Sequence, residues 1–253
     1  MSIWKNSNLF VLAPMDDVTD TVFRQIIADI SPPDIFFTEF ASVDGLNSGG
    51  REAVMKKLQF TDKEKPLVAQ VWGMEPANYT KAAKEISSMG FDGIDINMGC
   101  PVRKVISIGA CSGLINNREL AKDIVKATQK GSKVPVSVKT RLGFKEVDLS
   151  WIEFLLGLDI SCLTIHMRTV KEMSKVDAQW QYMEEMVKIR DKIAPDTALV
   201  GNGDIGSRKQ GEEYMQKYGI EGVMIGRGVF KDPYVFSKDS PWKSMSSKEK
   251  KQL

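Results

Sequence analysis

Asn97-Met98-Gly99-Cys100-Pro101 follows the apolar run Gly93-Ile94-Asp95-Ile96, and the interpretation of the whole chain starts from this stretch. A β-branched run that ends at Gly-Cys-Pro predicts a buried strand that delivers a thiol to a loop. Gly99 lets the backbone turn or approach a ligand closely, and Pro101 favours an extended conformation for Cys100. The simpler interpretation is a structural cysteine, because free cysteines are usually core residues. The Asn97 amide, the glycine and the proline beside Cys100 favour a functional thiol.

The composition is typical of a soluble globular protein. The 253 residues are 42% hydrophobic and 27% charged, with a formal net charge of +2. The three cysteines (Cys100, Cys111 and Cys162) are too few for a disulfide framework or a zinc site, which favours a reducing compartment. The N-terminus has no signal-peptide pattern, and no apolar run reaches the ~18 residues of a membrane span. We therefore expect a cytoplasmic protein that does not bind a membrane.

Eight apolar, β-rich runs alternate with helical stretches. We expect strands at 9–13, 35–38, 67–71, 93–96, 136–140, 162–165, 198–200 and 222–225, helices that include 20–30, 76–89 and 118–129, and a loop rich in glycine, serine and asparagine at 44–51. This alternation predicts an α/β protein with a parallel sheet, and eight units fit a (β/α)8 TIM barrel of ~250 residues. A doubly wound open sheet is the competing architecture. The absence of GxGxxG after the first run counts against it.

Polar side chains fall where the predicted strands end. They are Gln70, Asn97, Cys100, Lys139, His166, Arg168, Asn202, Asp204 and Arg227. In a barrel the carboxyl ends of the strands converge on one mouth, where active sites are built. This distribution is the strongest sequence argument for the barrel.

Several of these residues also have simpler interpretations. Lys139 can extend its aliphatic stem to the barrel rim, and His166, the only histidine, can be structural. Asn202-Gly203-Asp204 and Gly226-Arg227-Gly228 end the seventh and eighth runs, where barrels often bind phosphate. No HExxH or paired His/Cys spacing predicts a metal. A phosphate site, a lysine, a histidine and a loop thiol together suit flavin chemistry, in which the lysine stabilises negative charge on the reduced flavin.

In order along the chain, six segments resemble the tRNA-dihydrouridine synthase family from about residue 9 to residue 236. They are Leu12-Ala13-Pro14-Met15 with Val18-Thr19-Asp20 and Phe23-Arg24, Asn97-Met98-Gly99-Cys100-Pro101, Val138-Lys139-Thr140-Arg141, His166-Met167-Arg168-Thr169, Asn202-Gly203-Asp204 and Gly226-Arg227-Gly228. Asn-x-Gly-Cys-Pro and His-x-Arg-Thr are the specific segments. The glycine motif of the seventh strand also occurs in other FMN barrels.

The resemblance implies a role for each matching residue. The FMN ring would contact Pro14, Met15, Gln70, Lys139 and His166, and its ribityl phosphate would contact Asn202, Gly203, Asp204, Gly226 and Arg227. Cys100 would be the catalytic proton donor, and Asn97 and Arg168 would bind the substrate base or lie beside the flavin.

The resemblance also implies a reaction. NADPH reduces FMN, hydride passes to C6 of a uridine in tRNA, and Cys100 protonates C5 to give 5,6-dihydrouridine. A thiol with an ordinary pKa of about 8.5 is mostly protonated at neutral pH and can donate. The target base must leave its stack to reach the flavin. We expect a monomer, and we expect neither Cys111, in a separate loop, nor Cys162, within a strand, to replace Cys100.

The sequence departs from the family pattern in four places. Asp16-Asp17 puts two carboxylates near the flavin end, Met167 replaces a smaller residue, and Ser174-Lys175-Val176 differs from the expected stretch. We also expect residues 1–236 to form the FMN-binding barrel and residues 237–253 to form a short, polar, mobile tail in place of the family's helical tRNA-binding domain. This expectation predicts weak, salt-sensitive tRNA binding.

Two other functions stay open at this point. The chain can be another FMN-dependent barrel oxidoreductase that acts on a free small molecule, which would not bind tRNA. It can also be a non-catalytic RNA-binding relic, which would bind no flavin and oxidise no NADPH.

Overall fold

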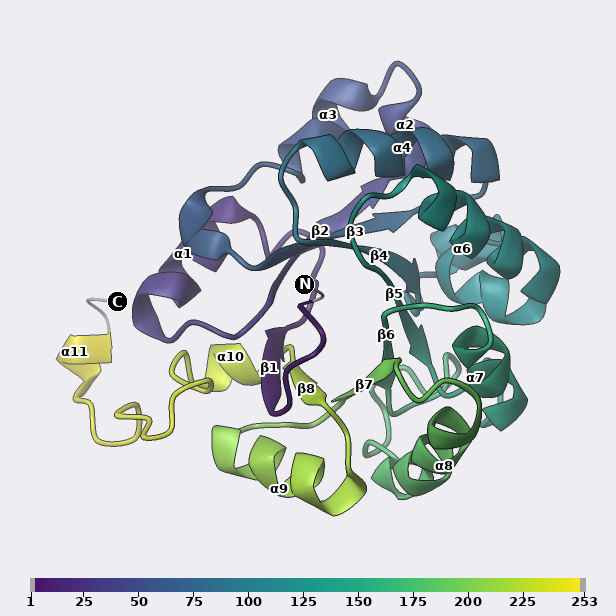
Figure 1. Ribbon diagram of the computed structural model, residues 1–253. Helices are drawn as coiled ribbons and strands as arrows, with labels where there is room; N and C mark the ends of the chain where they lie inside the picture. Colours follow the sequence, from purple (N-terminus) through teal and green to yellow (C-terminus); the bar gives the residue numbers. More distant parts are fainter. Residues whose placement is uncertain (1–2, 251–253) are drawn as a thin grey trace.

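Eight parallel strands form the centre of the molecule (Figure 1). The computed structural model describes residues 3–250. The strands are β1 (Leu9–Leu12), β2 (Phe36–Ser42), β3 (Leu67–Trp72), β4 (Gly93–Met98), β5 (Val136–Arg141), β6 (Cys162–His166), β7 (Ala198–Asn202) and β8 (Gly222–Ile225). Their order in the sheet is β1-β8-β7-β6-β5-β4-β3-β2, so β1 and β2 are the two outermost strands of the ladder.

The sheet closes on itself between those two strands. Val11 and Ile35 form an isolated parallel bridge, and the Leu12 amide donates to the Ile35 carbonyl oxygen at 3.0 Å. The Phe10 amide donates to the Asp34 carboxylate at 2.7 Å, which holds the start of β2 against β1. The predicted TIM barrel is therefore confirmed, and the open doubly wound sheet is wrong.

Helices surround the strands (Figure 1). They are α1 (Thr21–Ile30), α2 (Val43–Leu46), α3 (Arg51–Lys56), α4 (Pro76–Ser88), α5 (Arg103–Ser107), α6 (Arg118–Gly131), α7 (Leu149–Leu156), α8 (Met183–Ile193), α9 (Arg208–Tyr218), α10 (Gly228–Lys231) and α11 (Ser247–Lys250), with 3-10 turns η1 (Asp62–Glu64), η2 (Cys111–Asn116) and η3 (Trp180–Tyr182). Asp20 caps α1 as predicted, because its side chain accepts from the Phe23 amide.

The predicted loop at 44–51 is partly wrong. Its first residues belong to α2, because the Ser42 hydroxyl accepts from the Gly45 amide and caps a short helix there. Val43 and Leu46 bury their side chains in the core, which fixes this turn despite the polar residues around it. The start of the loop therefore packs against the barrel, whereas residues 47–51 are exposed.

Two sets of side chains fill the core. The larger set packs the outer face of the strands against the helices. A smaller set, which includes Leu9, Val11, Phe37, Cys162 and Val200, fills the end of the barrel opposite to the carboxyl ends of the strands. Because successive strand residues alternate between faces, the same inward face continues toward those carboxyl ends with polar residues.

Residues 237–250 follow α10 and lie outside the ring of strands (Figure 1). Arg208 of α9 donates to the Phe236 carbonyl oxygen at 2.6 Å, and a 2.8 Å hydrogen bond joins Ser237 to Ser31. The predicted division at residue 236 and the predicted mobile tail stay predictions, and the tail's residues 251–253 lie outside the described residues. Within residues 3–250, no helix is long and apolar enough to cross a membrane.

Candidate active site

The strand register brings the predicted site residues to one level of the barrel. Asn97 lies opposite Lys139, Arg141 opposite His166, and His166 opposite Asn202 across three neighbouring strand pairs. Each of these residues occupies one of the alternate strand positions whose side chains face the interior of the barrel. The polar layer at the carboxyl end of the barrel thus follows from the two-residue period of parallel strands.

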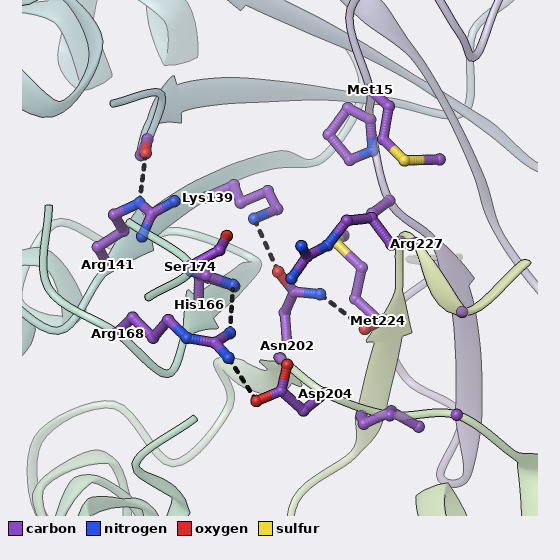
Figure 2. Close-up of a pocket in the computed structure, with 18 of the residues that line it drawn as sticks. Met15, Lys139, Arg141, His166, Arg168, Ser174, Asn202, Asp204, Met224 and Arg227 are labelled. Atoms are coloured by element: carbon purple, nitrogen blue, oxygen red, sulfur yellow. Dashed lines mark hydrogen bonds and ion pairs between the residues drawn. The ribbon is translucent and has the colours of Figure 1, made fainter. Parts of the chain in front are cut away.

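A cavity of about 490 Å³ opens above this layer (Figure 2). It is lined by Ala13, Pro14, Met15, Gly99, Lys139, Arg141, His166, Arg168, Ser174, Asn202, Gly203, Asp204, Ile205, Gly206, Met224, Gly226, Arg227, Gly228 and Lys231. Ten predicted site residues are among them. The other three (Gln70, Asn97 and Cys100) lie beside the cavity, in a buried network and in the adjoining loop.

Cationic side chains dominate the cavity wall. Lys139, Arg141, Arg168, Arg227 and Lys231 face one carboxylate, Asp204. Arg168 forms an ion pair with Asp204 (Figure 2). Burial alone would raise the pKa of Asp204, but hydrogen bonds from Arg168 and from a backbone amide lower it below the usual range. The cavity therefore has an excess of positive charge and suits an anionic ligand.

Lys139 lines the cavity and is half-buried. Its Nζ lies 3.2 Å from the Asn202 Oδ1, and Asn202 in turn donates to the Met224 carbonyl oxygen at 2.8 Å. Burial, with the neighbouring charge of Arg141, lowers the pKa of Lys139 to about 8. The ammonium is therefore still mostly protonated at neutral pH, so its charge is directed into the cavity. This excludes the interpretation of Lys139 as a stem reaching for solvent.

His166 is held neutral in the same wall. Burial lowers its pKa, and the charges of Lys139, Arg141, Arg168 and Arg227 lower it further. Its Nε2 lies 3.4 Å from Arg168 Nη1. Because a guanidinium only donates, Nε2 accepts and the proton of the neutral ring is on Nδ1. Nδ1 is buried and has no hydrogen-bond partner among the described residues. A ligand acceptor would satisfy it.

Two glycine loops form the far end of the cavity. Gly203 has a φ of +133°, a conformation that favours glycine, and a Cβ there would lie 2.9 Å from Ala178 Cβ. Trp180 fixes this loop, because its Nε1 donates to the Gly203 carbonyl oxygen at 2.9 Å. On the second loop Arg227 is exposed, and its side chain makes no hydrogen bond or ion pair with residues 3–250. It points into the cavity (Figure 2).

A buried polar network lies beneath the cavity. Asp95 is fully buried and accepts from Gln70 Nε2 at 2.8 Å and from Ser137 Oγ at 2.7 Å. Burial raises the pKa of Asp95 to about 6. Gln70 Oε1 accepts from Asn97 Nδ2 at 3.0 Å, so both polar groups of Gln70 are occupied within the protein. The predicted contact between Gln70 and FMN stays a prediction, but the structure gives Gln70 a clear role in orienting Asn97.

Asn97 shapes the loop that holds Cys100. Its Oδ1 accepts from the amides of Gly99 and Cys100, each at 3.0 Å. Arg141 Nε donates to the Gly99 carbonyl oxygen at 2.8 Å, and Arg141 Nη1 donates to the carbonyl oxygens of Thr169 and Met173. Arg141 therefore ties the Cys100 loop to the loop after β6.

The thiol of Cys100 is not an ordinary one. It is hydrogen-bonded to the thiol of Cys111, and this contact lowers the pKa of Cys100 to about 7. The Ser112 hydroxyl donates to the Cys100 carbonyl oxygen at 2.7 Å and holds η2 against the same loop. The expected ordinary pKa of Cys100 is therefore wrong. Cys111 lies beside Cys100 because the chain folds back after α5, and the expectation that Cys111 cannot replace Cys100 stays a prediction.

Cys100 opens into a second, largely apolar cavity of about 290 Å³. Phe40, Trp72, Val102, Asp16 and Lys57 are among its lining residues. The two cavities are lined by consecutive residues, Gly99 in the first and Cys100 in the second.

The departure at Asp16 and Asp17 has a structural explanation. Their carboxylates and that of Glu39 lie within 4.8 Å of one another, in the one grouping within the described residues that could hold a metal ion. The Lys57 ammonium forms ion pairs with all three. Its charge offsets their mutual repulsion. The carboxylate of Asp16 thus faces the Cys100 cavity, not the cavity of Lys139 and His166.

Four residues of the site were missed in the sequence. Arg141 and Asp95 have the inward parity of Lys139 and Asn97, so the two-residue period was a usable signal for both. Lys57 and Cys111 reach the site through helices and turns outside the strands. For these two, no local pattern gives the position.

The chain matches the family model for dihydrouridine synthase over residues 11–253. It is 48% identical over 233 residues to a probable tRNA-dihydrouridine synthase of Staphylococcus aureus strain COL, an alignment that covers 91% of this chain and 71% of that protein. It is 47% identical over 243 residues to probable tRNA-dihydrouridine synthase 2 of Bacillus subtilis strain 168, covering 95% of this chain and 74% of that protein.

Two solved structures share the fold. One is morphinone reductase in complex with tetrahydroNAD, with a TM-score of 0.63, 12% identity, and coverage of 92% of this chain and 88% of that chain. The other is an old yellow enzyme homologue from Zymomonas mobilis, with a TM-score of 0.61, 13% identity, and coverage of 92% and 90%. The match to the family model and to relatives at nearly half identity confirms the resemblance found in the sequence. The chain belongs to the dihydrouridine synthase family.

Proposed function

We propose that this protein is a tRNA-dihydrouridine synthase, an oxidoreductase that reduces uridine in tRNA to 5,6-dihydrouridine. The observation that carries the proposal is that consecutive residues, Gly99 and Cys100, line two different cavities. One has the cationic wall that a phosphorylated redox cofactor needs, and the other contains the thiol that a reduced base needs. Family membership supports the same assignment.

The residues of the larger cavity fit FMN. The unpartnered Nδ1 of His166 provides a donor for a ring acceptor, and Lys139 provides a half-buried ammonium. Arg227 and the amides of the two glycine loops suit a phosphate group, and Pro14 and Met15 supply an apolar surface for a planar ring. When bound, FMN would supply the hydride chemistry that no side chain here can perform.

Lys139 would act by charge. Its ammonium, fixed by Asn202 and mostly protonated at neutral pH, would stabilise negative charge on a ring placed above it. Arg168 is less free, because Asp204 and the Val176 carbonyl oxygen occupy part of its guanidinium. We therefore assign Arg168 to shaping the wall as well as to contacting the base or the cofactor.

Cys100 would donate the proton that C5 of the base needs. Asn97 and Arg141 fix the backbone on either side of Gly99, so the thiol is held in a defined position. A pKa near 7 makes Cys100 a better acid than an ordinary thiol while half of the molecules are still protonated near neutral pH. Asn97 acts through the loop, because both its oxygen and its amide nitrogen have partners within the protein.

The partners follow from this chemistry. The uridine must be extruded from the folded tRNA to reach the cavities, and the reductant would be NADPH. One chain contributes all of the residues assigned to the site, which is consistent with a monomer. A tRNA substrate and a free catalytic thiol are consistent with a cytoplasmic setting.

The test is conversion of unmodified tRNA by the purified protein. We expect the protein to carry flavin absorbance, and NADPH with tRNA to yield dihydrouridine, detected by mass spectrometry as a gain of two hydrogens on a uridine. Flavin without conversion of tRNA would favour another FMN barrel acting on a small molecule. Absence of both flavin binding and NADPH oxidation would favour the RNA-binding relic.

A further inference from the structure

Cys100 and Cys111 are two thiols in contact, and the proposed reaction uses only one of them. The Ser112 hydroxyl, next to Cys111, donates to the Cys100 carbonyl oxygen at 2.7 Å, and the interaction of the two thiols lowers the pKa of Cys100 and raises that of Cys111. Cys100 is 9% exposed and lines the smaller cavity, whereas Cys111 is fully buried behind it. A small oxidant can therefore reach Cys100, and the first sulfur that the oxidised Cys100 would meet is that of Cys111.

The backbone at Cys111 is unusual for a residue with a side chain. Its φ is +50°, a left-handed conformation that is sparsely populated outside glycine, asparagine and aspartate. Ser112 holds this conformation through its hydrogen bond to the Cys100 carbonyl oxygen. The left-handed turn directs the second thiol back to the first, so the strained backbone and the thiol contact are two separate observations about the same pair.

We propose that Cys100 and Cys111 are a redox-active pair that hydrogen peroxide converts into a disulfide, which removes the Cys100 thiol from the reaction. The loss of activity rests on the function proposed above, whereas formation of the disulfide does not. A second thiol beside an oxidisable one also protects it, because a disulfide is reversible and the sulfinic and sulfonic acids generally are not.

The oxidation balances with peroxide as the only oxidant. The Cys100 thiolate attacks one peroxide oxygen, the O–O bond breaks, an S–O bond forms and hydroxide leaves. The Cys111 sulfur then attacks the Cys100 sulfur, an S–S bond forms, the S–O bond breaks, and water leaves. Two thiols and one peroxide give one disulfide and two waters, and a dithiol reductant reverses the change.

The surroundings favour this sequence of steps. Contact with Cys111 lowers the pKa of Cys100, and thiolate character is what makes a cysteine reactive with peroxide. Between the two cysteines lies α5, with Val102 and Ile108 exposed on either side. This surface segment can adjust its backbone while the sulfurs approach bonding distance, which a segment inside the barrel could not do.

The test is mass spectrometry of the flavin-loaded protein after treatment with hydrogen peroxide, without reductant. We expect the intact mass to fall by two hydrogens and a peptide to appear that links Cys100 to Cys111. Dithiothreitol should restore the mass and the tRNA-reducing activity together. The proposal is overturned if Cys100 gains oxygen atoms while Cys111 stays a free thiol.

Variants separate the pair from the rest of the chain. In Cys111→Ser, peroxide should add two or three oxygen atoms to Cys100, giving a sulfinic or sulfonic acid, and dithiothreitol should no longer restore activity. Cys111→Gly removes the backbone strain and should behave in the same way if the serine variant folds poorly. Cys162→Ala is the matched control, because Cys162 is buried in β6 beside Thr164 and should leave the cross-link unchanged. A linked peptide that contains Cys162 would contradict the proposal.

The cross-link is measured as a mass, independently of tRNA reduction. A protein that forms the Cys100–Cys111 link but does not reduce tRNA would therefore refute the proposed function and leave the redox pair standing.

Discussion

The Cys100 thiol has to be protonated to donate to uracil, and a pKa of about 7 puts that requirement in the physiological range. Above this pH the protonated fraction falls about tenfold per pH unit, so the rate of uridine reduction should fall with it. Alkylation needs the thiolate and should change in the opposite direction. The same titration would therefore slow the first reaction and accelerate the second.

We expect the rate of Cys100 alkylation by iodoacetamide to rise with a midpoint near pH 7 in the native protein. Over the same interval the single-turnover rate of tRNA reduction should decrease. Cys162→Ala should leave both midpoints unchanged. A midpoint near 8.5, the value for a free cysteine, would mean that the contact with Cys111 does not act on Cys100 in solution.

Arg227 tests the phosphate end of the larger cavity. Its guanidinium faces the cavity without a protein partner, so Arg227→Ala should remove a charged hydrogen bond to the cofactor and little else. The expected loss is about 1.5–3 kcal/mol, or roughly tenfold or more in FMN affinity. Fluorescence titration measures it, with Lys188→Ala on the exposed side of α8 as a control of equal charge change. Equal affinity in both variants would place the phosphate elsewhere.

At the scale of elements, β7 and η3 together set the position of the phosphate loop. A Cβ on Gly201 would lie 2.4 Å from the ring of Trp180. That ring holds Gly203 through its indole nitrogen and stacks on Tyr218 of α9. Trp180, which does not line the cavity, therefore fixes the position of the loop at Gly203, which does line it.

Gly201→Ala should lower both thermal stability and FMN affinity. Overpacking of this kind costs about 1–3 kcal/mol, and a displaced Trp180 would release the Gly203 carbonyl. Gly49→Ala is the matched control, because a Cβ there meets no atom within 4 Å. Calorimetry and flavin titration on both variants check this. A Gly201→Ala protein that binds FMN with the wild-type affinity would show that the packing of Trp180 does not set the loop.

For the whole molecule, the barrel could be predicted from the sequence because the same pattern, an apolar run followed by a helical stretch, repeats along the chain. The run at 222–225 coincides with β8, and Asp20 caps α1 as predicted. Arg141, His166 and Asn202 lie opposite one another, and Lys139 lies two residues earlier on the same face of β5, because parallel register and a two-residue period leave few other arrangements. These features are local, or repeat along the chain, so the residues alone reveal them.

Other features of the site depend on how distant segments pack. The sequence shows Asp95 within an apolar run, and only the fold places Gln70 and Ser137 around it. Cys111 follows α5 in the chain, and its contact with Cys100 depends on a left-handed turn at a residue that rarely adopts one. A shifted pKa is the sum of such contacts, which is why the sequence suggested an ordinary thiol.

The most direct test of the account follows the flavin of the reduced protein in a stopped-flow experiment without oxygen, for wild type and Cys100→Ala. NADPH should reduce the flavin at the same rate in both proteins, because the thiol takes no part in that step. Unmodified tRNA should then reoxidise the wild-type flavin and the variant flavin at rates that differ by about 10²–10⁴-fold, the usual contribution of a general acid. Reoxidation by tRNA at equal rates in both proteins would contradict the account, since Cys100 would then be a structural residue at the end of β4.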